Sequence, residues 1–380
     1  VAKLAGNDSI LQHVTFQKPA DWTPSKQSAM FAEASSGTLK AFSGTKQVSA
    51  QSFNTNFLTT ATITEPNQFA VSGNTVAFSD NVLVNGGDIY LYDLATRQRT
   101  QVTQDGSSRD VDIDGNNVVY VSTLNGQYAV ELYDVVNQQT TAISTGAQEK
   151  RYPKISGRYV VWQDARSGVS QIYAYNLQTQ TETLLYDDSQ KYNQTFPDID
   201  GDSIVWVENG VYVALYSITA ATRTLVASDN VIRIMPHVSG NNIVWVQWGG
   251  LSSAGTYVYN IPSASLGALS LAGTTTSYSP VISGSRIVRT VAQESNVLDF
   301  VMDDLGNDAA YGTCDDLTGV PLTTDHSITN QAWPVMDGYN LVYLGSNGLY
   351  RINTDSLPVV NQNAEQAANV GQPISFASAA

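Results

Sequence analysis

A short motif recurs along most of the chain and limits the folds that the chain can adopt. Each copy has a few apolar residues, a Ser-Gly or Asp-Gly pair, and a second apolar run, as in "YPKISGRYVVWQD" and "FPDIDGDSIVWVE". Seven copies occur, and their turn glycines are Gly73, Gly115, Gly157, Gly201, Gly240, Gly284 and Gly338. The spacings between them are 42, 42, 44, 39, 44 and 54 residues. Such a period is typical of a four-stranded propeller blade.

The pattern within each copy predicts four strands. The first ends at the turn, where Ser or Asp bonds nearby backbone and Gly adopts a positive φ. The second is apolar, as in "RYVVWQD", the third alternates, as in "QIYAYNL", and the fourth is rich in Thr, as in "TETLLYD". β-Branched and aromatic residues dominate, and no segment of the repeat keeps an apolar stripe of helical period. We therefore expect strands throughout residues 66 to 362.

These observations predict one all-β domain, a seven-bladed propeller of four-stranded blades over residues 61 to 362. Residues 1 to 60 form an N-terminal extension outside the repeat, and residues 363 to 380 form a C-terminal tail. Within the approach to the first copy, "NTNFLTTATITEP" is expected to be a strand that either leads into the first blade or closes the ring. The extension is loosely docked, or it donates a strand to a neighbouring subunit.

The third copy, "PKISGRYVVWQDARSGVSQIYAYNLQT", resembles the TolB-like propeller repeats of secreted and cell-surface proteins of bacteria and archaea. The resemblance covers residues 66 to about 362, and the sixth copy departs from it most. It implies the fold and says little about function, because this scaffold carries binding modules, peptidase companions and polysaccharide lyases. In the turn after strand two, the resemblance implies that Asp164 and Arg166 form a salt bridge.

The balance of charges argues against two classes of partner. The chain has 19 basic and 34 acidic side chains and a net charge of -15, which repels nucleic acid and anionic membrane surfaces. No apolar run is long enough to span a membrane. The many amides and hydroxyls, the few lysines and a start at Val1 without Met fit an exported protein whose signal peptide was removed. We expect a secreted, cell-surface or extracellular location.

Motifs for familiar catalytic chemistry are missing from the sequence. The three histidines, His13, His237 and His326, have no metal-ligand spacing, and the single cysteine, Cys314, allows neither an internal disulfide nor a thiolate metal site. Neither a nucleophile elbow before a helix nor a phosphate-binding loop is present. We therefore expect no cofactor, with calcium as the one possible exception.

Calcium needs several oxygen ligands at one place, and an acidic insertion in the sixth copy offers them. The candidate ligands in "MDDLGNDAAYGTCDD" are Asp303, Asp304, Asp308 and Asp315. The alternative is a solvated acidic loop.

The connections that enter strand one cluster at one mouth of a propeller channel. Here they carry aromatic and cationic side chains that we predict to bind a ligand: Arg151, Tyr152, Lys191, Tyr192, Arg233, Tyr278 and Trp333. Such side chains suit a sugar or uronate polymer. If the protein is a lyase, the family resemblance implies Tyr152 or His237 as the base and Arg151 or Arg233 as the group that neutralises the substrate carboxylate. The alternative is that these aromatic residues only pack between blades.

The preferred functional prediction is a non-enzymatic extracellular propeller, a component of the cell surface or of a filament that acts by self-assembly or ligand binding. The expected partners are further copies of the chain or other surface proteins, and possible ligands include polysaccharide. Two alternatives stay open. One is a lyase that acts on an acidic polysaccharide at the channel mouth, and the other is a periplasmic scaffold that binds a peptide.

Overall fold

The computed structural model describes residues 12–13, 29–35, 38–44, 55–65, 67–83, 86–187, 192–229, 231–249, 253–269, 276–292, 298–306, 309, 316–323, 333–355 and 366–369. The chain divides into two units. One contains Val1–Ser49 together with Pro358–Ala380, and the other is Ala50–Leu357. Each unit is considered by itself.

The smaller unit contains a sheet made from both ends of the chain. Its strands are β1 (Gln12–His13), β2 (Ala29–Ser35), β3 (Thr38–Gly44) and β32 (Gln366–Asn369), in the order β1-β2-β3-β32. The pairing of β3 with β32 is antiparallel and sets Thr38 opposite Asn369. The N-terminal extension and the C-terminal tail, which were predicted as separate segments, therefore share a sheet.

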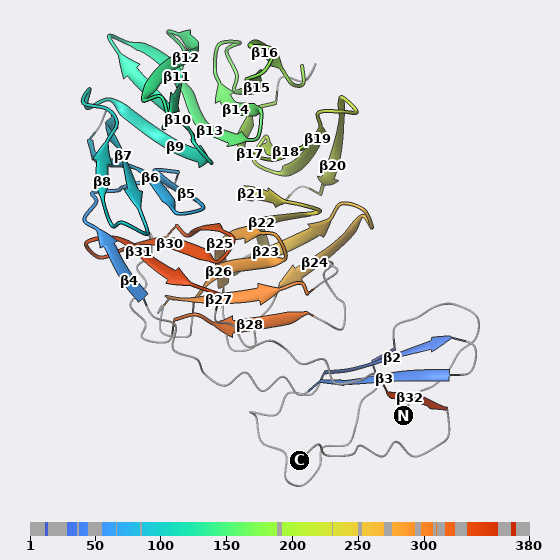
Figure 1. Ribbon diagram of the computed structural model, residues 1–380. Helices are drawn as coiled ribbons and strands as arrows, with labels where there is room; N and C mark the ends of the chain where they lie inside the picture. The colour runs from blue at the N-terminus through green and yellow to red at the C-terminus, as the bar shows by residue number, and fades with distance from the viewer. Residues whose placement is uncertain are drawn as a thin grey trace. The chain divides into compact units, whose positions relative to one another are not determined.

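The larger unit is an all-β propeller, as the repeat predicts (Figure 1). Four of its sheets follow the chain in order. They are β13 (Lys150–Ser156), β14 (Tyr159–Asp164), β15 (Gln171–Asn176) and β16 (Thr181–Leu184); β17 (Gln194–Asp200), β18 (Ser203–Glu208), β19 (Tyr212–Ser217) and β20 (Thr222–Ala227); β21 (Arg233–Ser239), β22 (Asn242–Gly249), β23 (Ser253–Asn260) and β24 (Ser265–Leu269); and β25 (Thr276–Ser283), β26 (Arg286–Ala292), β27 (Leu298–Asp304) and β28 (Leu317–Pro321).

A fifth four-stranded sheet combines the last repeat with a strand from before the first. It contains β29 (Val335–Asp337), β30 (Asn340–Gly345), β31 (Gly348–Asn353) and β4 (Thr55–Thr59), in that order. The β31–β4 pairing sets Ile352 opposite Thr55. Of the two roles that the sequence allowed for this N-terminal strand, closure of the ring is the one observed.

The expectation of seven four-stranded blades is wrong. The first two copies form one eight-stranded sheet, so five separate four-stranded blades remain in the described propeller. The strands of the large sheet are β5 (Phe69–Ser72), β6 (Thr75–Leu83), β7 (Gly86–Asp93), β8 (Arg99–Gln101), β9 (Ser108–Asp114), β10 (Asn117–Leu124), β11 (Gln127–Asp134) and β12 (Gln139–Gly146). The two halves join where Gly87 of β7 pairs with Ser108 of β9.

Glycine at the start of β7 explains this join. Gly86 has a φ of +116°, and a Cβ there would lie 2.8 Å from the carbonyl carbon of Ser107. Only a residue without a side chain lets β7 approach the next inner strand so closely. In the described residues the sheets of the other copies stay separate.

A ring of hydrogen bonds links the turns of successive copies. The Ser or Asp before each turn glycine accepts the N–H of the turn glycine in the next copy. The acceptors, in chain order, are Ser72, Asp114, Ser156, Asp200, Ser239 and Ser283. Asp337 closes the ring by accepting the N–H of Gly73 at 2.6 Å. These side chains were expected to stabilise their own turn, but they tie one copy to the next.

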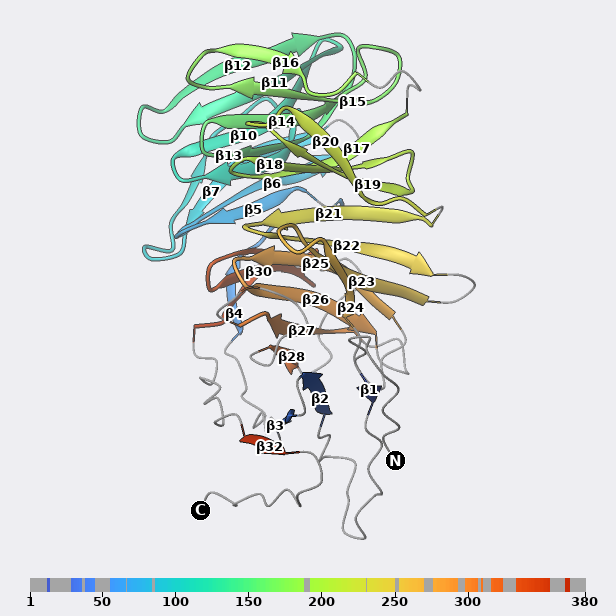
Figure 2. The same ribbon diagram turned by 90° about the vertical axis from the view of Figure 1, so that its right-hand side faces the viewer.

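The core lies between neighbouring sheets. Trp162, Trp206 and Trp245 occupy the same position of the second strand in three successive copies, and each is completely buried. Trp206, for example, packs in one cluster with Val161 and Ile172 of the preceding sheet. Figure 2 shows the sheets following one another face to face. The apolar second strand predicted for each copy is therefore the strand sealed between sheets.

The predicted Asp164–Arg166 salt bridge is present. Arg166 Nη2 lies 2.6 Å from Asp164 Oδ2, and the Arg166 N–H donates to Asp164 Oδ1 at 2.9 Å. Lys150 Nζ and Trp162 Nε1 donate to the same carboxylate, at 2.8 and 3.0 Å. The Asp164–Arg166 salt bridge therefore stabilises the turn. The hydrogen bond from Lys150 also links the inner strand β13 to the second strand β14.

No helix with the length and apolarity needed to cross a bilayer occurs in the part of the chain that the structure describes.

Candidate functional site: the mouth and the channel

The inner strands share an unusual backbone feature near the predicted mouth. In six of the seven copies the residue five positions before the turn glycine has a positive φ although it is not glycine: Asp110, Tyr152, Phe196, Met235, Ser279 and Trp333, with φ from 34° to 53°. In five of these copies the register of the first strand with the second strand also shifts at this point. A bulge of this kind changes the direction of the side chain it carries. The recurrence makes the bulge part of the repeat and not a property of one copy.

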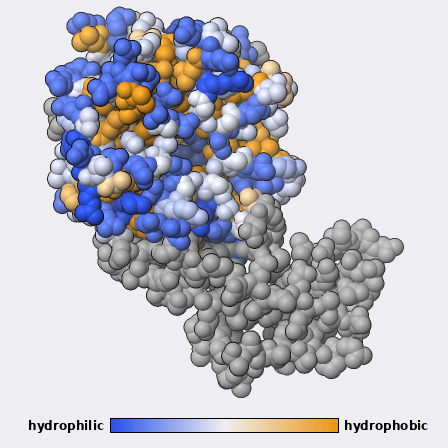
Figure 3. Space-filling view, viewed as in Figure 1, coloured by the Kyte–Doolittle hydropathy of each residue, from blue (hydrophilic) through white to orange (hydrophobic). Residues whose placement is uncertain are grey.

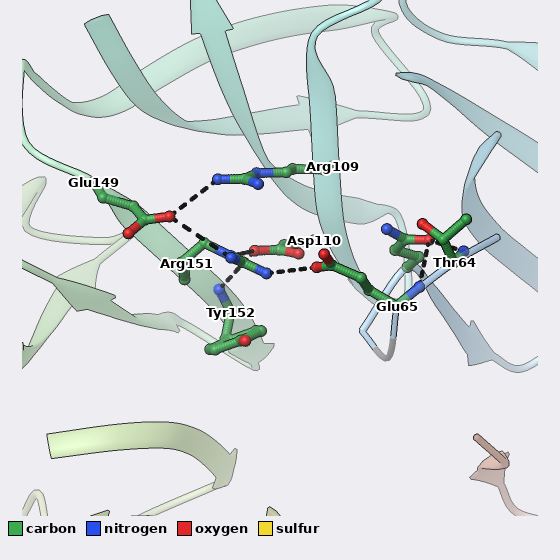
Figure 4. A network of polar contacts seen from close by, with 8 residues as sticks. Thr64, Glu65, Arg109, Asp110, Glu149, Arg151 and Tyr152 are labelled. Carbon is green, nitrogen blue, oxygen red and sulfur yellow. Dashed lines mark hydrogen bonds and ion pairs between the residues drawn. The ribbon is translucent and has the colours of Figure 1, made fainter. Parts of the chain in front are cut away.

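Arg151, one of the cations predicted at the mouth, forms ion pairs with acidic side chains. Arg151 lies 2.6 Å from Asp110 Oδ2, 2.9 Å from Glu65 Oε2 and 3.6 Å from Glu149 Oε1 (Figure 4). Arg109 contacts the same Glu149 at 3.3 Å. Three carboxylates and two guanidinium groups therefore meet here, with a net charge of -1. This cluster does not offer an uncompensated positive charge to an acidic polymer.

Buried polar atoms within this cluster have no hydrogen-bond partner among the described residues. They are Gln68 Nε2, Arg109 Nε and Asp110 Oδ1. Burial raises the pKa of Asp110, against the opposing effect of Arg151. The cluster therefore combines buried polar atoms around Asp110 with the half-exposed carboxylates of Glu65 and Glu149.

The ring of Tyr152 stacks on Phe196, with the two centroids 5.2 Å apart. Burial raises the pKa of the Tyr152 phenol, although the charge of Arg151 opposes this. A raised pKa makes the phenolate harder to form, which disfavours Tyr152 as a base at neutral pH.

The second predicted cation, Arg233, is buried and 1% exposed. Its guanidinium donates to the carbonyl oxygens of Asp229 and Val231 at 2.8 and 3.1 Å, and to that of Val211. It also donates to Gln247 Oε1 at 2.9 Å and pairs with the Asp229 carboxylate. Arg233 therefore holds its own loop together.

The other predicted mouth residues have varied surroundings. Tyr192 packs against the ring of Tyr212, with centroids 6.1 Å apart. Trp333 is half-buried and packs against the apolar cluster between the last and first copies. Tyr278 lies in β25, and Lys191 lies outside the described residues.

The candidate calcium ligands that the structure describes are engaged with other groups. Asp303 pairs with Arg289 at 2.7 Å, with both side chains 1% exposed, and it also accepts the N–H of Gly319 at 2.8 Å. Asp304 accepts from Ser285 at 2.7 Å and from Arg286 at 3.3 Å. Asp308 and Asp315 lie outside the described residues. No group of three metal-ligating side chains occurs in the described parts of the chain.

A cavity of about 220 Å³ lies among the inner strands. Residues one, two and three positions before each turn glycine line it in all seven copies. Its charged side chains at the third position, Asp112, Lys154, Asp198 and His237, come from four consecutive copies. Sequence reasoning selected only His237 of these. Comparison of the repeats at this one position would have revealed the others.

Comparisons with known proteins identify the fold of this chain but do not assign the chain to a family. No family model and no curated protein match the sequence. A chain of the Mitotic Checkpoint Complex is similar in structure, with 14% identity over 80% of this chain and 93% of that chain and a TM-score of 0.55. An oligogalacturonate lyase in complex with manganese has 12% identity over 88% and 96% of the two chains and a TM-score of 0.53. TolB from Acinetobacter baumannii, at 14% identity over 76% and 78%, has a TM-score of 0.42.

At such low identities the likeness concerns the fold alone. The activities of these proteins therefore do not transfer directly to this chain.

Proposed function

We propose that this chain is a non-enzymatic propeller that acts outside the cytoplasm, as a structural or interaction component of the cell surface or of a filament. The observation that carries the proposal is the engagement of three of the four predicted catalytic groups, His237 being the exception. Arg151 is held by three carboxylates, and Arg233 is buried against backbone carbonyl oxygens. Tyr152 is stacked on Phe196. These contacts of Arg151, Arg233 and Tyr152 stabilise the fold.

Self-assembly is supported by the small sheet built from the two ends of the chain. Its edge strands are β1 and β32. An edge strand presents unpaired N–H and C=O groups that accept a strand from another chain. Among the described residues, each chain thus carries a sheet whose edge strands have one unpaired side, and short terminal strands that a second chain can take up.

The surface supports assembly through strands better than through one apolar face. On the described part of the face drawn in Figure 3, hydrophobic and hydrophilic residues are interspersed. One similar propeller belongs to the Mitotic Checkpoint Complex, so a related fold serves within a protein assembly.

Negative-stain microscopy and light scattering test the proposal. The full chain is expected to form large particles or fibres, and a variant that begins at residue 50 is expected to be monodisperse. This variant keeps β4, so the last propeller sheet stays complete. If the full chain is itself monodisperse, assembly is excluded.

The lyase alternative has support only from the fold, through the likeness to oligogalacturonate lyase. That structure is a complex with manganese, whereas the described residues here contain no group of three side chains placed to hold a metal. A lyase would release an unsaturated uronate product, which absorbs ultraviolet light. Such a product from polygalacturonate, lost in both Tyr152→Phe and His237→Ala, would replace the proposed function by the enzymatic one.

A further inference from the structure

The channel lining has two different sides at one level of the repeat, three residues before the turn glycine. Four consecutive copies contribute Asp112, Lys154, Asp198 and His237, and the other three contribute Ala70, Val281 and Val335. The lining is therefore charged along one arc and apolar along the other.

The charged arc is reached by solvent and is not fully neutralised. Lys154 Nζ lies 3.6 Å from Asp112 Oδ1, and His237 Nδ1 lies 3.4 Å from Asp198 Oδ2. The four side chains keep between 11% and 27% of their surface exposed. Lys154 is the single lysine or arginine among the described lining residues of this arc, and the carboxylates of Asp112 and Asp198 both act on it.

The next level of the channel adds three more carboxylates, from Asp114, Asp200 and Asp337. Each uses Oδ2 to accept a glycine N–H, at 2.6 Å in all three cases. Their Oδ1 atoms have no hydrogen bond to another described residue. Five carboxylates and one lysine thus give the lining a strongly negative potential, and such a cavity attracts cations.

The spacing of the carboxylates selects the kind of cation. They come from three different copies around the ring, and no three metal-ligating side chains of the described residues gather at one point. A compact metal ion needs such a gathering. A linear cation whose charges are separated by methylene groups does not. The apolar arc suits the methylene groups, because burial of a CH₂ beside Val281 and Val335 is favourable.

We propose that the channel binds a linear aliphatic diamine or polyamine. Its ammonium groups contact the carboxylates of Asp112 and Asp198 and those of the level below, and its methylene chain lies along the apolar arc. The cavity of about 220 Å³ holds roughly seven waters at ~30 Å³ each, enough for a chain of several methylenes. This inference is independent of the proposed function.

Calorimetric titration of the full chain with putrescine and spermidine at low salt tests the proposal. We expect one saturable site whose affinity is about tenfold weaker or more in Asp198→Asn, because a charge-assisted hydrogen bond is lost. Asp187→Asn is the matched control. It removes the same charge from an exposed position outside the cavity lining.

Two further variants separate channel binding from general attraction to an acidic protein. Val281→Phe fills the cavity without a change of charge and is expected to abolish binding, whereas Lys154→Met removes the competing cation and is expected to strengthen it. Circular dichroism verifies that each variant is folded. Equal weakening by Asp187→Asn and Asp198→Asn, or full binding by folded Val281→Phe, would overturn the proposal.

Discussion

The carboxylate of Asp164 collects hydrogen bonds from Arg166, Lys150 and Trp162 in a fully buried position. Burial by itself would raise its pKa, but these hydrogen bonds outweigh burial and lower the pKa from 3.8 to about 2. The folded state therefore binds this proton less readily than the unfolded state does.

Asp164 should accordingly stabilise the fold above about pH 4, and this contribution should be lost as the pH falls through 2. The loss for wild type is about 2 kcal/mol. Denaturant unfolding at several pH values checks this, and Asp164→Asn should show a weaker dependence than wild type in this window. Asp187→Asn, at an exposed position, should keep the wild-type dependence.

The buried pair of Asp303 and Arg289 gives a second prediction at this scale. Asp303→Ala leaves Arg289 buried without its partner, so the free energy of unfolding should fall by about 3–5 kcal/mol. Thermal unfolding with and without calcium checks the result. If calcium strongly stabilises wild type but not this variant, Asp303 is a ligand as well as a partner of Arg289.

Single residues also show the limit of prediction from sequence. The cations and aromatic side chains at the mouth were visible as residue types. Two of the three acids that neutralise Arg151 are distant in the sequence, since Glu65 and Asp110 lie 86 and 41 residues away. Such pairs form only when the sheets are arranged around the channel, so charge type alone suggested a ligand where the fold uses an ion pair.

Among the structural elements, the join between β7 and β9 depends on one glycine. Gly86→Ala introduces a Cβ 2.8 Å from the backbone of Ser107 at a φ of +116°. We expect a loss of about 1–3 kcal/mol from backbone strain, with the steric overlap in addition. Gly126→Ala is the control, because its φ is also positive but no atom lies within 4 Å of the added Cβ. Chemical denaturation of both variants should rank Gly86→Ala as clearly less stable.

The strand β4 gives another prediction for an element. A chain that begins at residue 60 lacks β4, and β31 then becomes an exposed edge. We expect this chain to unfold at a lower temperature and to aggregate, since open edges pair with other chains. A chain that begins at residue 50 retains β4 and should match the thermal stability of the full propeller. Light scattering during heating distinguishes the two, and equal behaviour would show that β4 is dispensable.

For the whole propeller, the ring of turn hydrogen bonds predicts which substitutions are tolerated. Ser and Asp perform the same task in different copies, so Asp114→Ser should change the free energy of unfolding by less than about 0.5 kcal/mol. Asp114→Ala leaves the N–H of Gly157 without its acceptor and should cost about 1 kcal/mol. Unfolding in urea measures both, and a loss in Asp114→Ser as large as that in Asp114→Ala would contradict the role assigned to the ring.

Much of the whole-molecule fold was predictable, because a repeat that fixes strand length and turn position also fixes the class of architecture. The way in which the seven copies divide into separate sheets was not predictable. Whether two neighbouring copies stay apart or merge depends on a local approach of two backbones at Gly86 and Ser107. The sheet shared by the two chain ends was also beyond prediction, since β3 and β32 lie outside the repeat and more than 300 residues apart.

The pairing of β4 with β31 has a consequence for how the molecule is made. During synthesis β4 emerges well before its partner β31, which ends at Asn353. Until then β4 lacks the strand with which it pairs, and closure of so long a loop carries an entropic cost. The ring is therefore completed only after Asn353 has left the ribosome, and until then β4 is exposed to other nascent chains. Closure should be the slow and vulnerable step in the biogenesis of this protein.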